Sequence, residues 1–199
     1  MSAAPAVFLD RDGTMIHDPG YLARLEGLQW YPWTVDAVRL LNRAGFRVFV
    51  TTNQGGVGLG LYEESFVHAV HGVMTAHLTS GGARIDGWFY CMHHPQAIVE
   101  GLRLECDCRK PRPGMIRQAQ ERFELDLFRS FVVGDKRSDV RLAASVGARG
   151  VLVRTGHGQH EAALPDAGAA ASAHIAANLM EAAAWILAQS GHPHDGATS

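Results

Sequence analysis

The sequence predicts an α/β fold: a doubly wound, Rossmann-like parallel sheet with no large cap domain. Two observations support this prediction. Short apolar runs alternate with amphipathic runs, which is typical of strand–helix–strand units with right-handed crossovers. Polar residues follow the apolar runs where the strands should end, and in parallel sheets ligands bind at this edge.

Five apolar runs predict the strands in chain order. They are AVFLD (6–10), FRVFVTT (46–52), IDGWFYC (85–91), SFVVGD (130–135) and GVLV (150–153). Apolar residues at helical spacing predict helices after the first two strands, the second ending before Gly81. Pro113 starts a helix predicted to reach about Leu125. Two further helices are predicted over 137–148 and 178–189, with an Ala/Gly-rich loop over 156–173.

The composition is that of a globular protein. The chain has 199 residues, 47% hydrophobic and 19% charged, and we predict a single domain over 1–190 with a disordered tail over 191–199. A formal net charge of −2, without long basic runs, predicts no nucleic-acid partner. The sequence lacks a signal-peptide pattern and a membrane-spanning apolar segment. We therefore expect a cytoplasmic monomer with no membrane partner.

Two carboxylates follow the first predicted strand, Asp10 and Asp12 in DRDGT. Asp and Gly form turns, so a turn alone would explain one such motif. Thr52, Lys110 and Asp135 fall at comparable strand ends or loops, and this set suits phosphoryl transfer. A carboxylate can attack phosphorus while Mg²⁺, which prefers oxygen ligands, screens the charge, and the hydroxyl and ammonium groups can bind phosphoryl oxygens.

FLDRDGT, VTTNQ, CRKP and VVGDKRSD resemble, in order, the four motifs of haloacid dehalogenase (HAD)-type phosphatases over about residues 6–156. The resemblance implies that Asp10 is the nucleophile and Asp12 the general acid/base. It implies that Thr52 and Lys110 stabilise the phosphoryl group. The implied catalytic Mg²⁺ ligands are Asp10, Asp12 through its backbone carbonyl, and Asp135.

Asp139 follows in the fourth motif. We expect it to orient Lys136 or a metal-bound water. A helix N-terminal acid that interacts with the helix dipole is the alternative.

All three cysteines of the chain lie in one stretch. Cys91, His93, Cys106 and Cys108 supply the four sulfur and nitrogen ligands of a closed, structural Zn²⁺ site. A disulfide or unliganded thiols are the alternatives, and His94 could replace His93. We favour His93 because alternate residues of an extended segment point to the same side.

We call residues 91–108 the cysteine loop. Metal binding supplies folding energy, so zinc is predicted to fold this loop. Folding of the loop would then fix the positions of Arg109 and Lys110, which follow it directly.

The cysteine loop, HDPGYL, CRKPRPGM and VRTGHG are similar to the heptose bisphosphate phosphatases of this superfamily. That resemblance implies removal of the 7-phosphate of D-glycero-D-manno-heptose 1,7-bisphosphate, a small phosphorylated sugar. Arg109 would bind the second phosphate through its bidentate guanidinium, or else be a solvated surface cation. The substrate-binding residues that the resemblance implies are Asp18, Pro19, Gly20, Tyr21, Asn53, Gln54, Gly55, Arg109 and Lys136.

Two alternatives remain open from the sequence. The loop NQGGVGLG has Gly55 where the heptose group commonly has serine and Leu59 where it commonly has a cation, so it leans toward the histidinol-phosphate phosphatases. The substrate could then be histidinol phosphate or another small sugar phosphate. The alternative from another class is a zinc-organised binding module without catalysis.

Overall fold

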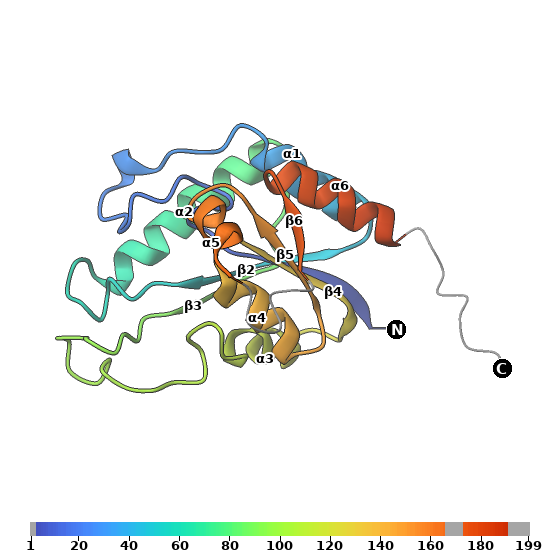
Figure 1. Ribbon diagram of the computed structural model, residues 1–199. Helices are drawn as coiled ribbons and strands as arrows, with labels where there is room; N and C mark the ends of the chain where they lie inside the picture. Colours follow the sequence, from blue (N-terminus) through green and yellow to red (C-terminus); the bar gives the residue numbers. More distant parts are fainter. Residues whose placement is uncertain (1–2, 166–172, 191–199) are drawn as a thin grey trace.

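The computed structural model describes residues 3–165 and 173–190, and the predicted tail over 191–199 lies outside these residues. One six-stranded parallel sheet, in the order β3-β2-β1-β4-β5-β6, forms its centre (Figure 1). The order runs outward in two directions from β1 and β4, which confirms the doubly wound prediction. The strands are β1 (Ala4–Leu9), β2 (Arg47–Asn53), β3 (Gly87–Cys91), β4 (Leu125–Gly134), β5 (Arg149–Val153) and β6 (His174–Ala176).

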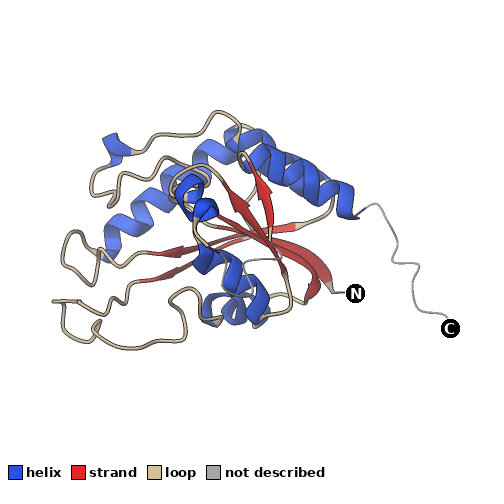
Figure 2. Ribbon diagram, viewed as in Figure 1, coloured by secondary structure: helices blue, strands red, loops and turns tan. Residues whose placement is uncertain are grey.

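Helices cover both faces of the sheet (Figures 1 and 2). One face packs against α1 (Thr34–Arg43), α2 (Glu64–Ser80) and α6 (Leu179–Ser190). The other packs against α3 (Gly114–Gln120) and α4 (Arg137–Ser145). Two short helices, η1 (Leu25–Gly27) and α5 (Gly158–Ala163), lie in the connections.

Successive side chains of a strand point to opposite faces of the sheet, and this alternation explains the two layers. In β1, Val7 and Leu9 belong to the core beneath α1, α2 and α6, whereas Ala6 and Phe8 belong to the core beneath α3 and α4. All four side chains are fully buried. Burial of a large apolar side chain contributes about 1.5–3 kcal/mol, so both layers are held by the hydrophobic effect.

Three elements differ from the prediction, two in extent or type and one because it was not predicted. The helix after Pro113 ends at Gln120 instead of near Leu125, where β4 begins, because Leu125 pairs with Ala4 of β1. Residues 156–173, predicted as loop, include α5. The strand β6 was not predicted, because three residues are too short to show a period; it pairs with β5.

The loops that follow β1, β2 and β3 leave the same end of the sheet, at the left of Figure 1. In the described part of the chain these segments contain no second sheet and no large helical unit, which confirms the prediction of a fold without a large cap domain. Within residues 3–165 and 173–190, no helix combines the length and hydropathy needed to cross a membrane.

Candidate active site

The carboxyl ends of three adjacent strands bring the predicted catalytic groups together. Asp10 follows β1, Thr52 lies near the end of β2, and Asp135 follows β4. The register places Leu9 of β1 beside Val50 of β2 and Val133 of β4, so these ends lie next to one another. The site therefore occupies the point between β1 and β4 where the strand order reverses, the usual binding position in such sheets.

Lys110 is buried at the centre of this group. Its Nζ lies 2.6 Å from Asp10 Oδ1 and 2.6 Å from Asp139 Oδ1, and it donates to the Thr51 carbonyl at 2.9 Å. Asn53 holds its backbone by accepting from the Lys110 N–H at 3.0 Å. Burial lowers the pKa of Lys110, but the two carboxylates outweigh burial and raise it above its ordinary value, so the ammonium stays charged.

Carboxyl oxygens of Asp10, Asp135 and Asp139 all lie within 4.8 Å of one another. Burial, with the charge of Asp10, raises the pKa of Asp135 to about 8. Burial also raises the pKa of Asp139 to about 6, although Lys110 opposes the rise. Asp135 Oδ2 accepts from the His157 N–H at 2.8 Å, whereas its buried Oδ1 has no donor among the described residues.

This arrangement fits Mg²⁺. Crowded carboxyl oxygens with one buried, unpartnered atom are suited to a hard divalent cation. The chemistry of the donors thus agrees with the predicted ligands Asp10 and Asp135, and it adds Asp139 as a third carboxyl group. The carboxyl group of Asp12 does not belong to this cluster.

The Asp12 carboxylate lies beside the cluster and contacts other residues. Arg11 Nη2 is 2.9 Å from Asp12 Oδ2, and Gln54 Nε2 donates to the same oxygen at 3.0 Å. Gln54 Nε2 also donates to Thr52 Oγ1 at 2.8 Å. Both Asp12 and Thr52 still line the cavity above the strands.

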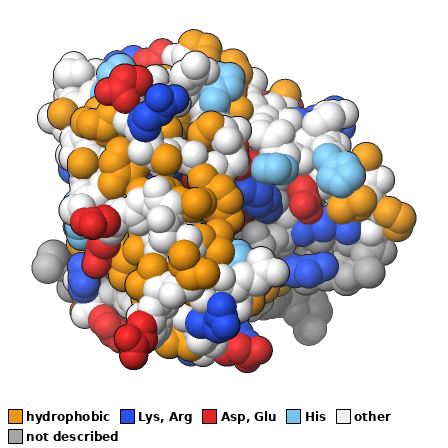
Figure 3. Space-filling model, turned by 90° about the vertical axis from the view of Figure 1, so that its left-hand side faces the viewer, with side chains coloured by type: hydrophobic (Ala, Val, Ile, Leu, Met, Phe, Trp, Pro, Cys, Tyr) orange, Lys and Arg blue, Asp and Glu red, His pale blue; other side chains and the backbone are white. Residues whose placement is uncertain are grey.

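The active-site cavity has a volume of about 380 Å³, within the range of small-molecule sites. Figure 3 views this end of the molecule and shows basic side chains gathered beside acidic and histidine side chains. The residues that line the cavity are Asp10, Asp12, Gly20, Tyr21, Thr52, Asn53, Gly55, His94, Arg109, Lys110, Lys136 and Ser138.

Three predicted substrate residues are not among those that line this cavity. Asp18 instead accepts from Lys136 Nζ at 3.1 Å, and its Oδ2 also lies 3.1 Å from His157 Nε2. Pro19 is exposed and lies between Asp18 and the cavity residue Gly20. Gln54 is buried, with its amide toward Asp12 and Thr52.

Two residues that line the cavity were not predicted to do so, His94 and Ser138. His94 was considered only as a zinc ligand, and Ser138 was overlooked although it lies next to Asp139 in the fourth motif. Gly55 explains the position of His94. A Cβ at residue 55 would lie 3.0 Å from His94 Cδ2 and 3.1 Å from Arg109 Nη1, so glycine allows both side chains to approach the loop.

The cysteine loop gathers its predicted ligands. Ligand atoms of Cys91, His93, Cys106 and Cys108 lie within 4.8 Å of one another, and His94 is not in this group. The sulfur of Cys91 is 3.0 Å from that of Cys108 and 3.5 Å from that of Cys106, which excludes a disulfide bond in this arrangement. The hydrogen bond between the sulfurs of Cys91 and Cys108 lowers the pKa of Cys108 to about 5. Three thiols and one imidazole are consistent with a structural zinc site.

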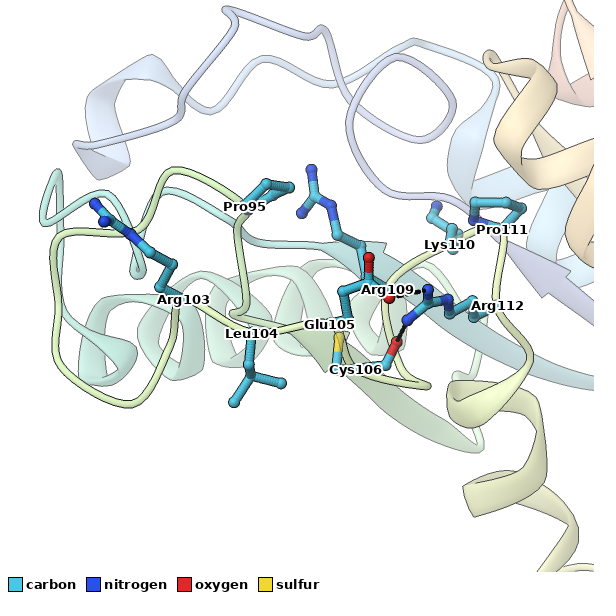
Figure 4. A pocket seen from close by; sticks show the side chains of 9 residues that line it. All are labelled: Pro95, Arg103, Leu104, Glu105, Cys106, Arg109, Lys110, Pro111 and Arg112. Carbon is cyan, nitrogen blue, oxygen red and sulfur yellow. Dashed lines mark hydrogen bonds and ion pairs between the residues drawn. The ribbon is translucent and has the colours of Figure 1, made fainter.

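Two arginines fasten the cysteine loop from its C-terminal side. Arg109 Nη1 donates to the His93 carbonyl and Arg112 Nη1 to the Cys106 carbonyl, each at 2.9 Å. A neighbouring pocket of about 500 Å³ is lined by both arginines, by Lys110 and by Cys106 (Figure 4). Since Arg109 and Lys110 also line the active-site cavity, the cysteine loop directly borders the site.

The fold and the acidic cluster define a HAD-type phosphatase, and comparisons with known proteins specify the family. The HAD-hydrolase-like family model matches residues 107–182. D-glycero-beta-D-manno-heptose-1,7-bisphosphate 7-phosphatase of Escherichia coli (strain K12) is 42% identical over 156 residues, 77% of this chain and 81% of the relative. The enzyme of the same name from Rhodopseudomonas palustris is 43% identical over 146 residues, 73% of this chain and 81% of the relative. The chain belongs to the D,D-heptose 1,7-bisphosphate phosphatase family.

Solved structures agree with this assignment. A D,D-heptose 1,7-bisphosphate phosphatase from B. bronchiseptica, complexed with magnesium and phosphate, has a TM-score of 0.80 at 30% identity and covers 93% of this chain and 99% of its own. The same enzyme from Burkholderia thailandensis has a TM-score of 0.66 at 30% identity, with 92% and 98% covered. The protein is therefore a phosphomonoesterase of the HAD type.

Proposed function

We propose that this protein is a Mg²⁺-dependent phosphatase that removes the 7-phosphate of D-glycero-D-manno-heptose 1,7-bisphosphate. The observation that carries the proposal is the buried contact of Asp10 with Lys110 at the floor of the active-site cavity, 2.6 Å between Oδ1 and Nζ. Sequence identity of 42% to the E. coli enzyme supports the same substrate.

In the first step the Asp10 carboxylate attacks the 7-phosphorus and a P–O bond forms as the bond to the sugar oxygen breaks. Asp12 donates a proton to the leaving alkoxide. In the second step Asp12 takes a proton from water, whose oxygen attacks the phosphorus. The bond between phosphorus and the Asp10 oxygen then breaks, which releases inorganic phosphate and restores the Asp10 carboxylate. Thr52 and Lys110 bind the phosphoryl oxygens as their charge changes.

Asp10 and Asp135, with Asp139 or the backbone carbonyl of Asp12, would hold the metal. When bound, Mg²⁺ screens the repulsion between phosphate and carboxylate. Arg109 and Lys136 line the cavity and supply positive charge for the second phosphate, which does not react.

Zinc has a structural role in this proposal. Bound by Cys91, His93, Cys106 and Cys108, it would hold the cysteine loop so that Arg109 and Lys110 keep their positions. The three thiols are free of disulfide bonds, which fits the predicted cytoplasmic location, because a reducing compartment keeps thiols reduced.

A phosphate-release assay with Mg²⁺ tests the function. The substrates are both anomers of heptose 1,7-bisphosphate, histidinol phosphate and simple sugar phosphates, and ³¹P NMR identifies the phosphate that is lost. We expect the highest kcat/KM with a heptose bisphosphate and loss of the 7-phosphate. A preference for histidinol phosphate would favour the alternative that the protein is a histidinol-phosphate phosphatase, which the residue Gly55 suggested. If no substrate released phosphate, the result would support the alternative of a zinc-organised binding module without catalysis.

A further inference from the structure

Arg11, between the two catalytic acids in the sequence, is only 2% exposed. Its Nε donates to Asp12 Oδ2 at 3.1 Å, and its Nη2 donates to Asp12 Oδ1 at 3.1 Å and to Gln54 Oε1 at 3.0 Å. Its Nη1 lies 3.5 Å from Nε2 of His71 in α2. A buried guanidinium is costly unless it is paired and hydrogen-bonded, so these contacts hold the Arg11 side chain in one position.

Gln54, in the loop after β2, is also only 2% exposed. Its Nε2 donates to Asp12 Oδ2 at 3.0 Å and to Thr52 Oγ1 at 2.8 Å. Its Oε1 accepts from Arg11 and, at 3.0 Å, from the Tyr62 hydroxyl. An amide offers two N–H donors and two acceptor sites, so protein groups use the full hydrogen-bonding capacity of Gln54.

These contacts fix the orientation of the Gln54 amide. The reverse orientation would point its N–H groups at the Arg11 guanidinium, which only donates, and its Oε1 at the Asp12 carboxylate, which only accepts. Asp12 is therefore held on two sides, by Arg11 from its own loop and by Gln54 from the loop after β2. Proton transfer in catalysis requires the acid or base within hydrogen-bond reach of its partner, and small displacements are costly to the rate.

We propose that Gln54 and Arg11 are positioning residues that hold the Asp12 carboxylate for proton transfer, and that the Gln54 side chain makes no contact with the substrate. This inference rests on the proposed phosphatase function. It assigns Gln54 a different role from the one implied by the family resemblance, because its amide has no free group to offer.

The variant Gln54→Met tests the role, since it keeps the volume and removes the amide. With an alkyl phosphate substrate we expect kcat to fall about 10- to 100-fold at nearly constant KM, within the range of general acid–base catalysis. Ser130→Ala is the matched control. It removes a buried hydrogen bond, 2.8 Å from the Ala6 N–H, at the other end of β1, and we expect its kcat to stay at the wild-type value.

Substrate choice separates positioning from a general structural effect. The phenolate of 2,4-dinitrophenyl phosphate leaves without a proton, so only the second step needs Asp12. In single turnovers with excess enzyme, Gln54→Met should release dinitrophenolate at the wild-type rate, while its steady-state turnover falls at least 10-fold. Tyr62→Phe leaves Gln54 in place but removes one hydrogen bond to it. It should also release dinitrophenolate at the wild-type rate, and its steady-state turnover should fall by a smaller factor than that of Gln54→Met.

A double-mutant cycle with Asp12→Ala completes the test. If Gln54 acts through Asp12, adding Gln54→Met to Asp12→Ala causes no further loss. A raised KM with unchanged kcat, wild-type kcat in folded Gln54→Met, or equal losses in both steps would overturn the inference. Wild-type activity of Asp12→Ala itself would instead overturn the proposed mechanism, so the two failures are distinguishable.

Discussion

Lys110 Nζ lies 2.6 Å from Asp10 Oδ1, although 100 positions separate the two residues in the chain. The same ammonium lies 2.6 Å from Asp139 Oδ1. It therefore contacts both the residue that follows β1 and the first turn of α4. Asn53 at the end of β2 holds the Lys110 backbone. One buried cation therefore connects several of the HAD-type motifs and balances part of the charge of the acidic cluster.

Lys110→Met should affect both stability and activity. Removal of the cation leaves Asp10 and Asp139 buried without their partner, and breaking buried pairs costs about 3–5 kcal/mol. Loss of one donor to the phosphoryl group should also lower kcat about 10²–10³-fold. Chemical denaturation and steady-state kinetics measure these effects. Arg43→Met is the control, because Arg43 is an exposed cation in the last turn of α1, and unchanged stability of Lys110→Met would contradict the prediction.

Mg²⁺ should stabilise the protein more at pH 8 than at pH 6. Burial and the charge of Asp10 raise the pKa of Asp135 to about 8 from an unfolded value of 3.8. The folded protein thus holds a proton that the unfolded chain releases, so without metal the free energy of unfolding falls as pH rises between these values. The ionised carboxylate is the form that binds Mg²⁺, so metal binding strengthens over the same interval.

Melting temperatures with and without Mg²⁺ at the two pH values provide the measurement. The variant Asp135→Asn cannot ionise at residue 135 and should show a smaller shift. This shift should grow less between pH 6 and pH 8 than in the wild type, because Asp139, with its pKa raised to about 6, still ionises there. An equal Mg²⁺ effect at both pH values in the wild type would contradict the assigned role of Asp135.

His71 should make the protein less stable in mild acid. Burial, with the nearby Arg11 charge, lowers the pKa of His71 to about 3 from 6.5. The folded state keeps this imidazole neutral while the unfolded state binds a proton below pH 6.5. Its contribution to stability is therefore complete above pH 6.5 and is lost as pH falls toward 3, at up to about 1.4 kcal/mol per pH unit.

Denaturation curves from pH 7 to pH 5 measure this slope. His71→Gln keeps a hydrogen-bonding side chain beside Arg11 but does not titrate. The slope of its free energy of unfolding against pH should therefore correspond to the uptake of up to one proton fewer on unfolding. His68→Gln, at an exposed position one turn earlier in α2, is the control and should retain the wild-type slope. Equal slopes in all three proteins would exclude His71 as the source.

The two adjacent histidines of the cysteine loop should differ in their effect on zinc. His93→Asn removes a ligand and should reduce the zinc content, the melting temperature and kcat, because Arg109 and Lys110 lose their support. His94→Asn should keep one zinc per chain and change KM, because His94 lines the active-site cavity. Metal analysis of the purified variants distinguishes them. Full zinc content in His93→Asn would show that His93 is not a ligand.

The sequence alone predicted the sheet, its strand ends and most residues around the site. Alternating apolar and amphipathic runs determine the order of strands and helices, and parallel strands bring Asp10, Thr52 and Asp135 to one edge. The spacing of the cysteines predicted the cluster with His93. It did not predict β6, because three residues show no period, or the end of α3, because pairing with β1 is a long-range contact.

Residue types and local period are properties of the chain, and they were sufficient for the fold class, the acids at the strand ends and the cysteine cluster. Only the tertiary structure decided the neighbours of each side chain. It placed Asp139 beside Lys110, His94 in the cavity, and the Gln54 amide against Asp12 and Thr52. These contacts depend on how separate loops pack above the sheet. The order of residue types along the chain does not show which loops will pack together.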